Sequence, residues 1–98
     1  MAELRFDWDP RKAAANLRKH GVSFEEAQTS FLDEGALVIE DPDHSEGEDR
    51  FILLGLSAGL RVLFVCHCAR QGGSLIRIIS ARRAIRHEQE QYLERLRR

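Results

Sequence analysis

Apolar residues recur with two different spacings along the chain, and these spacings predict its secondary structure. Alternation of apolar and polar positions indicates strands, whereas spacings of three and four residues indicate helices. The predicted order of elements is β-α-α-β-β-β-β-α. Strands are predicted over residues 4–8, 36–40, 50–56, 60–69 and 75–81, and helices over residues 10–20, 24–32 and 83–97.

The ends of the first two helices carry clear local signals. Asp9 followed by Pro10 is typical of an N-cap and a first helical residue, and Gly21 is a natural residue just past a helix end. Ser23 and Glu26 form a capping box, so the second helix is predicted to begin at the residue after Ser23.

Short turns between consecutive strands predict an antiparallel β-sheet with helices, and the fold class is therefore α+β. The strand segments at residues 62–66 and 75–79 are apolar on both faces, which is typical of central strands. Helices can cover one face of such a sheet, and the other face needs a further cover or a partner. We expect a single domain over residues 1–98.

Charge is unevenly distributed, although the formal net charge is only −1. Residues 1–49 hold five Lys/Arg and thirteen Asp/Glu, a net of −8, and residues 50–98 hold ten and three, a net of +7. Two interpretations stay open: the halves neutralise each other, or a basic face meets a polyanion.

The cellular location is predicted from the N-terminal residues, the lengths of the apolar runs and the two cysteines. Its first residues are polar and no apolar run approaches the length of a membrane span, so we expect neither a signal peptide nor a membrane partner. Cys66 and Cys68 stand two apart on one strand, too far apart for an easy disulfide. Free thiols fit a reducing compartment, and we expect a cytoplasmic protein.

The most unusual stretch is the arginine-bearing strand that begins near residue 75. Arg77, Arg82 and Arg83 lie in or just after an apolar run, and no Asp or Glu occurs between Asp49 and Glu88. A guanidinium in such a place needs a carboxylate partner or an anionic ligand such as phosphate. Strand alternation puts Arg77 and Arg82 on opposite faces, so a single phosphate site built from both requires the strand to end near Ser80 or to twist.

Two further sets of residues could carry chemistry. Lys12, Asn16 and Lys19 form one polar stripe on the first helix, which is either a solvated face or a rim that contacts phosphate. His67 is either an acid–base group or a packed strand residue, and alternation places it opposite both cysteines, against a shared metal site. The chain has no phosphate-binding loop, dinucleotide fingerprint or zinc-protease motif, and we expect no cofactor and no metal.

Short blocks of residues in a particular order cover nearly the whole chain. They are Phe6-Asp7-Trp8-Asp9, Lys12, Asn16, Lys19-His20-Gly21, Phe24-Glu25-Glu26-Ala27, Asp41-Pro42-Asp43-His44, Glu48, Arg50, Gly55, Arg70, residues 76–82, Ala84, Glu88 and Tyr92. In these blocks the sequence resembles the BrnT family, toxins of type II toxin–antitoxin systems. The resemblance implies a RelE-like fold and a metal-independent ribonuclease that arrests growth by cutting RNA. It also implies a hetero-oligomer with a BrnA-type antitoxin, which would bind operator DNA for the pair.

The resemblance also suggests which residues form the site. Glu48, Arg50, Arg77, Arg82, Glu88 and Tyr92 stand where the family has its polar signature residues. In an RNA-cleaving site, Arg50, Arg77 and Arg82 would stabilise charge on phosphorus. Glu48 or His67 would act as base, and His67, Tyr92 or an arginine as proton donor. Lys12, Lys19, Arg70 and Arg83 would hold the RNA backbone.

The sequence departs from the family pattern at three positions. Cys68 and Ala69 stand where members commonly have Thr and an acid, and Ile85 stands where they often have a capping Thr. Because isoleucine has no capping oxygen, the last helix is expected to begin earlier or differently. These departures leave open an alternative function, a non-catalytic module of the same fold that binds protein or nucleic acid.

Overall fold

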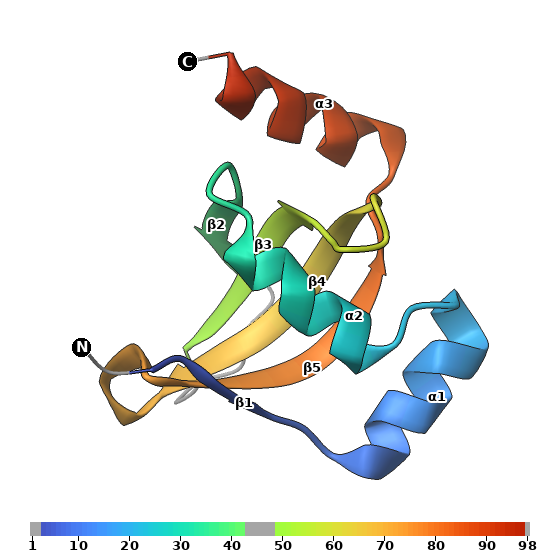
Figure 1. The fold of residues 1–98 in the computed structure, drawn as a ribbon, viewed down its shortest axis with the longest axis vertical. Coiled ribbons are helices and arrows are strands. Elements are labelled where there is room, and N and C mark those ends of the chain that lie inside the picture. The colour runs from blue at the N-terminus through green and yellow to red at the C-terminus, as the bar shows by residue number, and fades with distance from the viewer. Residues whose placement is uncertain (1–2, 43–48, 98) are drawn as a thin grey trace.

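The computed structural model describes residues 3–42 and 49–97. At its centre is a five-stranded sheet with the order β1-β5-β4-β3-β2 (Figure 1). The α+β class is confirmed, and β2 to β5 pair antiparallel as predicted. The pairing of β1 with β5 is parallel, which the sequence analysis did not predict. The strands are β1 (Arg5–Asp7), β2 (Leu37–Glu40), β3 (Arg50–Leu56), β4 (Val62–Arg70) and β5 (Leu75–Arg83).

The first helix, α1 (Pro10–His20), has the predicted boundaries. The Asp9 carboxylate accepts a hydrogen bond from the Arg11 N–H at 2.9 Å, so it satisfies a backbone donor that the helix leaves free. At the other end Gly21 has φ of 70°, a left-handed conformation that glycine adopts without steric cost.

The second helix is shorter than predicted. α2 (Phe24–Thr29) begins after Ser23, whose hydroxyl accepts a hydrogen bond from the Glu26 N–H at 3.0 Å. The remaining residues form a tighter 3₁₀ turn, η1 (Ser30–Leu32). Such turns are common at the ends of α-helices.

The last helix, α3 (Arg86–Leu96), begins three residues later than predicted because β5 continues to Arg83. Ile85 occupies the N-cap position and makes no side-chain cap bond. The Glu88 carboxylate instead accepts a hydrogen bond from the Ile85 N–H at 2.9 Å. Of the two hydrogen bonds in a capping box, only the one from the N-cap N–H to the Glu88 carboxylate therefore forms, because it needs no hydroxyl at the N-cap.

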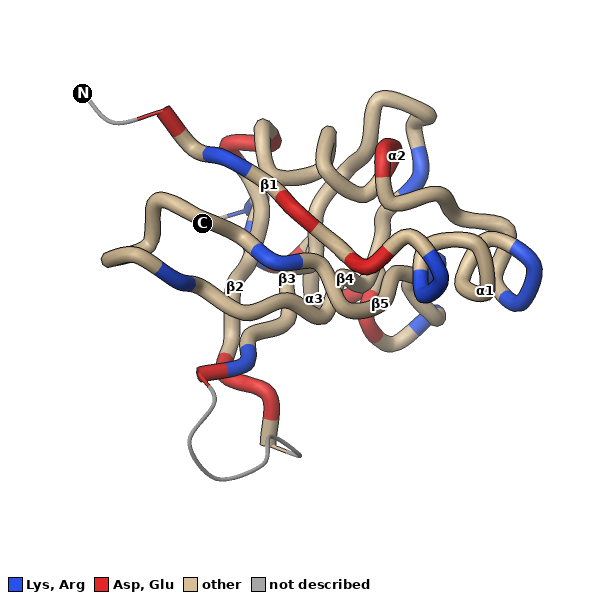
Figure 2. Tube along the Cα trace, turned by 90° about the horizontal axis from the view of Figure 1, so that it is seen from below, with Lys and Arg blue, Asp and Glu red and all other residues tan. Residues whose placement is uncertain are grey.

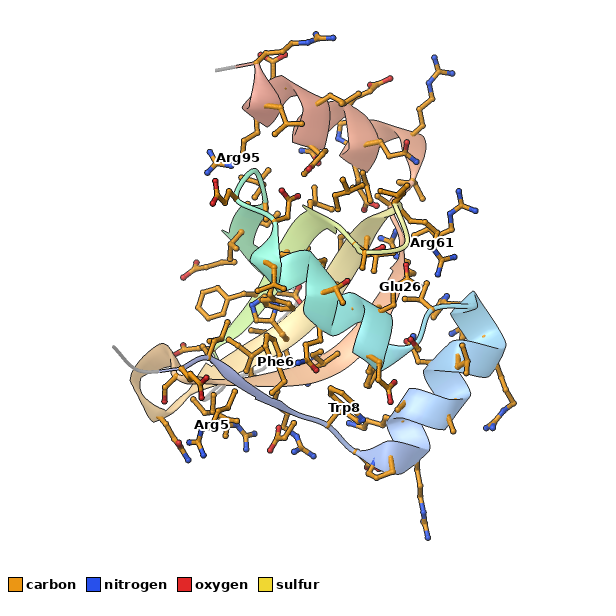
Figure 3. All side chains as sticks on the ribbon, viewed as in Figure 1. Arg5, Phe6, Trp8, Glu26, Arg61 and Arg95 are labelled. Carbon is orange, nitrogen blue, oxygen red and sulfur yellow. The ribbon has the colours of Figure 1, made fainter. Side chains whose placement is uncertain are left out.

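The helices α1 and α2 cover one face of the sheet, and α2 crosses in front of the strands in Figure 1. Figure 3 shows Phe6 and Trp8 of the N-terminal segment below α2. The Trp8 and Phe24 rings pack edge to face, with their centroids 5.9 Å apart. The large side chains that are almost wholly buried here are Val22, Phe24, Leu63, Val65 and Ile78. This covered face holds the main core.

Asn16 joins α1 to the free edge of β5 and is not part of a solvated stripe. Its amide nitrogen donates to the Val22 and Ala81 carbonyls at 2.9 and 2.7 Å, and its amide oxygen accepts from the Ala81 N–H at 3.1 Å. The side chain is buried, at 7% exposure. The predicted polar stripe is therefore wrong at its central residue, because Asn16 faces inward.

The opposite face is covered only at one end, by α3. Leu54, Ala84 and Tyr92 form a small second cluster there. The Tyr92 hydroxyl donates a hydrogen bond to Asp33 Oδ2 at 2.6 Å, which fastens α3 to the turn before β2. In the described residues no helix is long and apolar enough to cross a membrane.

A β-bulge interrupts β5 where it pairs with β4. His67 lies opposite Ile78, but the preceding residue, Cys66, lies opposite Ser80, so Ile79 has no partner in the register. An extra residue of this kind shifts the alternation of side chains by one position. Side chains after the bulge therefore point to the other face from the one that simple alternation predicts.

The bulge corrects the prediction that Arg77 and Arg82 lie on opposite faces. Arg77 lies opposite Cys68 and Arg82 opposite Phe64, and these β4 residues are four apart and share a face. The strand neither ends near Ser80 nor breaks before Arg82. Both arginines thus reach the partly covered face, with backbones about 13 Å apart along the strand.

Candidate functional site

A groove opens on the partly covered face, beside the first turns of α3. Its volume is about 460 Å³, within the range of small-ligand sites. Strand residues such as Ile52 and Phe64 supply apolar surface. The polar side chains in its lining are Asp41, Arg50, Ser80, His87, Glu88 and Gln91.

Two arginines flank one position of β4 on this face. Cys68 lies opposite Arg50 of β3 and opposite Arg77 of β5. Because neighbouring strands are about 4.8 Å apart, the two arginine backbones are about 10 Å apart. Arg77 Nη1 lies 3.2 Å from the Asp7 carboxylate of β1. The arginine pair that geometry brings closest is therefore Arg50 with Arg77, not Arg77 with Arg82.

Arg82 is held firmly at the α3 end of the same face. Its guanidinium donates two hydrogen bonds to the Glu88 carboxylate, at 2.8 and 2.9 Å, and lies 3.9 Å above the Phe64 ring. Burial alone would raise the pKa of Glu88, but hydrogen bonds from Arg82 and the Ile85 N–H outweigh it and hold that pKa below its usual value. A bidentate ion pair therefore stands at the groove wall.

A buried thiol lies in the floor of the groove. Cys66 Sγ is 3.5 Å from Asp41 Oδ2 and donates a weak hydrogen bond to it. Burial, followed by the interaction with Asp41, raises the pKa of the Cys66 thiol to about 11. Such a thiol stays protonated at neutral pH and is a poor nucleophile.

Ion pairs join the acidic and basic halves of the chain. Glu26 of α2 and Arg61, just before β4, face each other in Figure 3 and form a salt bridge. Asp7 and Arg77 form another, where β1 and β5 lie side by side (Figure 2). Mutual neutralisation by these pairs therefore accounts for part of the charge asymmetry.

The comparison with protein families identifies the chain. Residues 8–88 match the model described as "Ribonuclease toxin, BrnT, of type II toxin-antitoxin system". The chain belongs to the BrnT family. It is a ribonuclease toxin, and membership implies an RNA substrate and an antitoxin partner.

A solved structure supports the fold. The chain is similar to the Brucella abortus ribonuclease toxin BrnT, whose crystal structure was determined at 1.1 Å. The identity is 24% over 85% of this chain and 99% of that one, with a TM-score of 0.62. No curated protein matches the sequence.

In this BrnT fold His67 lies in the core and not in the groove. It is 4% exposed, and its ring meets Phe31 edge-on at 4.8 Å on the face that α1 and α2 cover. Burial lowers the pKa of His67, and the contact of Nδ1 with the Val65 carbonyl only partly opposes this. The expectation that His67 acts as acid or base is therefore not supported, because the sheet separates it from the groove.

Tyr92, like His67, is buried and engaged in contacts within the fold. The residue is 5% exposed and its hydroxyl is engaged with Asp33. Burial and that hydrogen bond raise the pKa of Tyr92 to about 12. The side chain packs with Leu54 and Ala84 in the cluster beneath α3 and is not among the residues that line the groove, which argues against a role as proton donor.

The residues predicted to hold RNA are scattered. Lys12 and Lys19 are exposed on α1, Arg70 is exposed at the end of β4 and Arg83 at the end of β5. The groove lining includes none of them. Glu48, the other predicted base, lies outside the described residues.

Sequence reasoning missed four polar groove residues: Asp41, Ser80, His87 and Gln91. Asp41 and Ser80 lie within the blocks that resemble the family, but neither was predicted to be a site residue. The signal for His87 was available, since it directly precedes Glu88 in the first turn of the last helix. The sequence alone, however, does not show that the first turn of this helix faces a groove, so His87 was not predicted.

Proposed function

We propose that RNA binds along the partly covered face of the sheet and is cleaved in the groove without a metal ion. The observation that carries this proposal is the convergence of Arg50, Arg77 and Arg82 on that one face. Guanidinium groups recognise phosphate through paired hydrogen bonds. A ribonuclease needs such groups where a phosphodiester is to be attacked.

The arginines support two different roles. We assign to Arg50 and Arg77, which lie on either side of Cys68, the binding of one phosphate and the stabilisation of the negative charge that develops on it. That phosphate has to compete with the Asp7 carboxylate for Arg77. Arg82 is already bound to Glu88, so an incoming phosphate has to compete with that carboxylate. Arg82 therefore fits a role in binding a neighbouring phosphate at the groove wall.

We further propose that a BrnA-type antitoxin forms a hetero-oligomer with this chain and blocks the groove. Support comes from the sheet face itself, which α3 covers only at one end and which leaves Ile39 at 41% exposure. Binding of the pair to operator DNA would depend on the antitoxin. We also propose that the protein is cytoplasmic and that residues 1–98 form a single domain.

The experiment is RNA cleavage by the purified, partner-free chain in EDTA. Wild type, Arg50→Ala, Arg77→Ala and Arg82→Lys are compared with Arg18→Ala, which removes an exposed arginine from the last turn of α1. We expect about a 100-fold loss or more for Arg50→Ala or Arg77→Ala and wild-type cleavage for Arg18→Ala. Thermal unfolding of each variant confirms that it is folded.

Two results would contradict the proposal. One is an absence of cleavage by wild type in EDTA with activity restored by added divalent metal. The other is equal cleavage by the three groove-face variants and wild type. If wild type binds RNA, cleaves none under either condition and does not arrest growth when expressed alone, the non-catalytic alternative is favoured.

A further inference from the structure

A metal-independent ribonuclease needs a proton donor for the leaving oxygen, and two of the donors expected from the sequence, His67 and Tyr92, are engaged elsewhere. His67 lies in the core on the far side of the sheet, and the Tyr92 hydroxyl is bonded to Asp33. The donor must instead come from a side chain that faces the groove. His87 is such a side chain.

The fold places His87 at the groove by simple helix geometry. It is the second residue of α3, directly before Glu88 and one turn before Gln91, and all three line the groove. Residues four apart lie on the same face of a helix, so His87 and Gln91 share one. The imidazole is exposed, so RNA can reach it.

The other ionisable groups in the described part of the groove are poor donors at neutral pH. Arginine does not release its proton, which sets Arg50 aside. Burial raises the pKa of the Cys66 thiol to about 11. Glu88 is ionised against Arg82 with a lowered pKa, and Asp41 accepts a hydrogen bond from Cys66.

Histidine is the side chain that ordinarily exchanges protons between pH 5 and 8. The charged and titratable groups around His87 come from every element that borders the groove. They are Asp41 after β2, Arg50 of β3, Cys66 of β4, Arg82 of β5, and Arg86 and Glu88 of α3.

We propose that His87 is the proton donor of the reaction, an inference that rests on the proposed function above. The RNA 2′-oxygen forms a bond to phosphorus as its proton passes to water. The bond from phosphorus to the 5′-oxygen breaks, and that oxygen takes the proton of the His87 imidazolium. The products are a 2′,3′-cyclic phosphate and a 5′-hydroxyl, and the imidazole regains a proton from solvent.

The test is single-turnover cleavage of an RNA oligonucleotide, measured in EDTA between pH 5 and 9. The variants are His87→Gln, His87→Lys, which keeps a cation for phosphate, and His20→Gln as a matched control at the end of α1. We expect both His87 variants to lose about 100-fold or more and to lose the limb of the pH profile that wild type shows on the alkaline side. His20→Gln should follow wild type.

A second substrate separates proton donation from RNA binding or folding. In it a sulfur atom replaces the 5′-oxygen that leaves, and a thiolate departs without protonation. We expect His87→Gln to cleave this RNA at the wild-type rate. An equal loss on both substrates, or an unchanged alkaline limb in His87→Gln, overturns the role of His87 while leaving the proposed function intact. Absence of any wild-type cleavage in EDTA would overturn both.

Discussion

The two faces of the sheet are built for different purposes. On the covered face, α1 and α2 bury a continuous apolar core and a histidine whose surroundings suppress its charge. On the opposite face, α3 covers one end, and charged side chains stand beside exposed strand surface. The same two strands, β4 and β5, contribute to both faces.

This contrast shows how a short chain fits both a core and a site onto one sheet. Residues of β4 alternate between Val65 in the core and Cys66 in the groove, so every second position is available for function. The bulge at Ile79 then moves Arg82 to the groove face, where ordinary alternation would have turned it toward the core. A charged residue that the core cannot tolerate thereby becomes available to a ligand.

The largest expected effect comes from the covered face. Phe24→Ala should lower the free energy of unfolding by about 3–5 kcal/mol, because Phe24 is wholly buried and truncation leaves a cavity. Urea unfolding measures this loss, and RNA cleavage per folded molecule should remain near wild type. The exposed Gln28→Ala on the same helix is the control. A stable Phe24→Ala protein without cleavage would show that the two faces are not separable.

Asn16→Ala should cost less, about 2–3 kcal/mol, because it removes three hydrogen bonds and leaves Ala81 with unsatisfied backbone groups. Lys12→Ala, on the same helix but exposed, should leave stability within about 0.5 kcal/mol of wild type. Chemical unfolding of both variants gives the comparison. Equal stability of the two would mean that Asn16 belongs to a solvated stripe after all.

Tyr92→Phe tests whether the Tyr92 hydroxyl has a structural or a catalytic role. Removing the hydroxyl deletes the hydrogen bond to Asp33, and we expect a loss of about 1.5 kcal/mol, since the acceptor is charged. Cleavage of RNA should continue at the wild-type rate once folded protein is matched. A folded Tyr92→Phe protein with a large loss of cleavage would restore Tyr92 as a candidate proton donor.

Local signals in the sequence were enough to predict the elements, since caps, turns and alternation act over a few residues. Asp9, Ser23 and Gly21 mark helix ends for physical reasons that need no distant partner. The faces were harder to predict. A bulge depends on how β5 pairs with β4, and nothing in residues 75–83 alone requires an extra residue at Ile79.

The site was predictable only in part for the same reason. The arginines were found because guanidinium groups in an apolar strand need a carboxylate or an anionic ligand, and for Arg82 the structure supplies the Glu88 carboxylate. His67 and His87 could not be ranked without knowing which face of the sheet the helices cover. Alternation shows that His67 and the cysteines are on opposite faces but not which face is open.

The smallest expected effect is a dependence of stability on pH, carried by Glu26. Hydrogen bonds from Arg61 lower the pKa of Glu26 below its ordinary value of 4.5, although burial opposes this. A lowered pKa in the folded state contributes stability that is present above pH 4.5 and is lost as pH falls through the folded value. Because both side chains are partly exposed, we expect only about 1 kcal/mol.

Urea unfolding at pH 7 and near pH 3 measures this contribution. Wild type should lose more stability on acidification than Glu26→Gln, whereas the exposed neighbour Glu25→Gln should follow wild type. Cleavage of RNA by Glu26→Gln should match wild type at neutral pH, because Glu26 ties α2 to the turn before β4 and stands apart from the groove. An identical acid response in Glu26→Gln and wild type would show that the pair with Arg61 contributes nothing, and that the covered face depends on apolar packing alone.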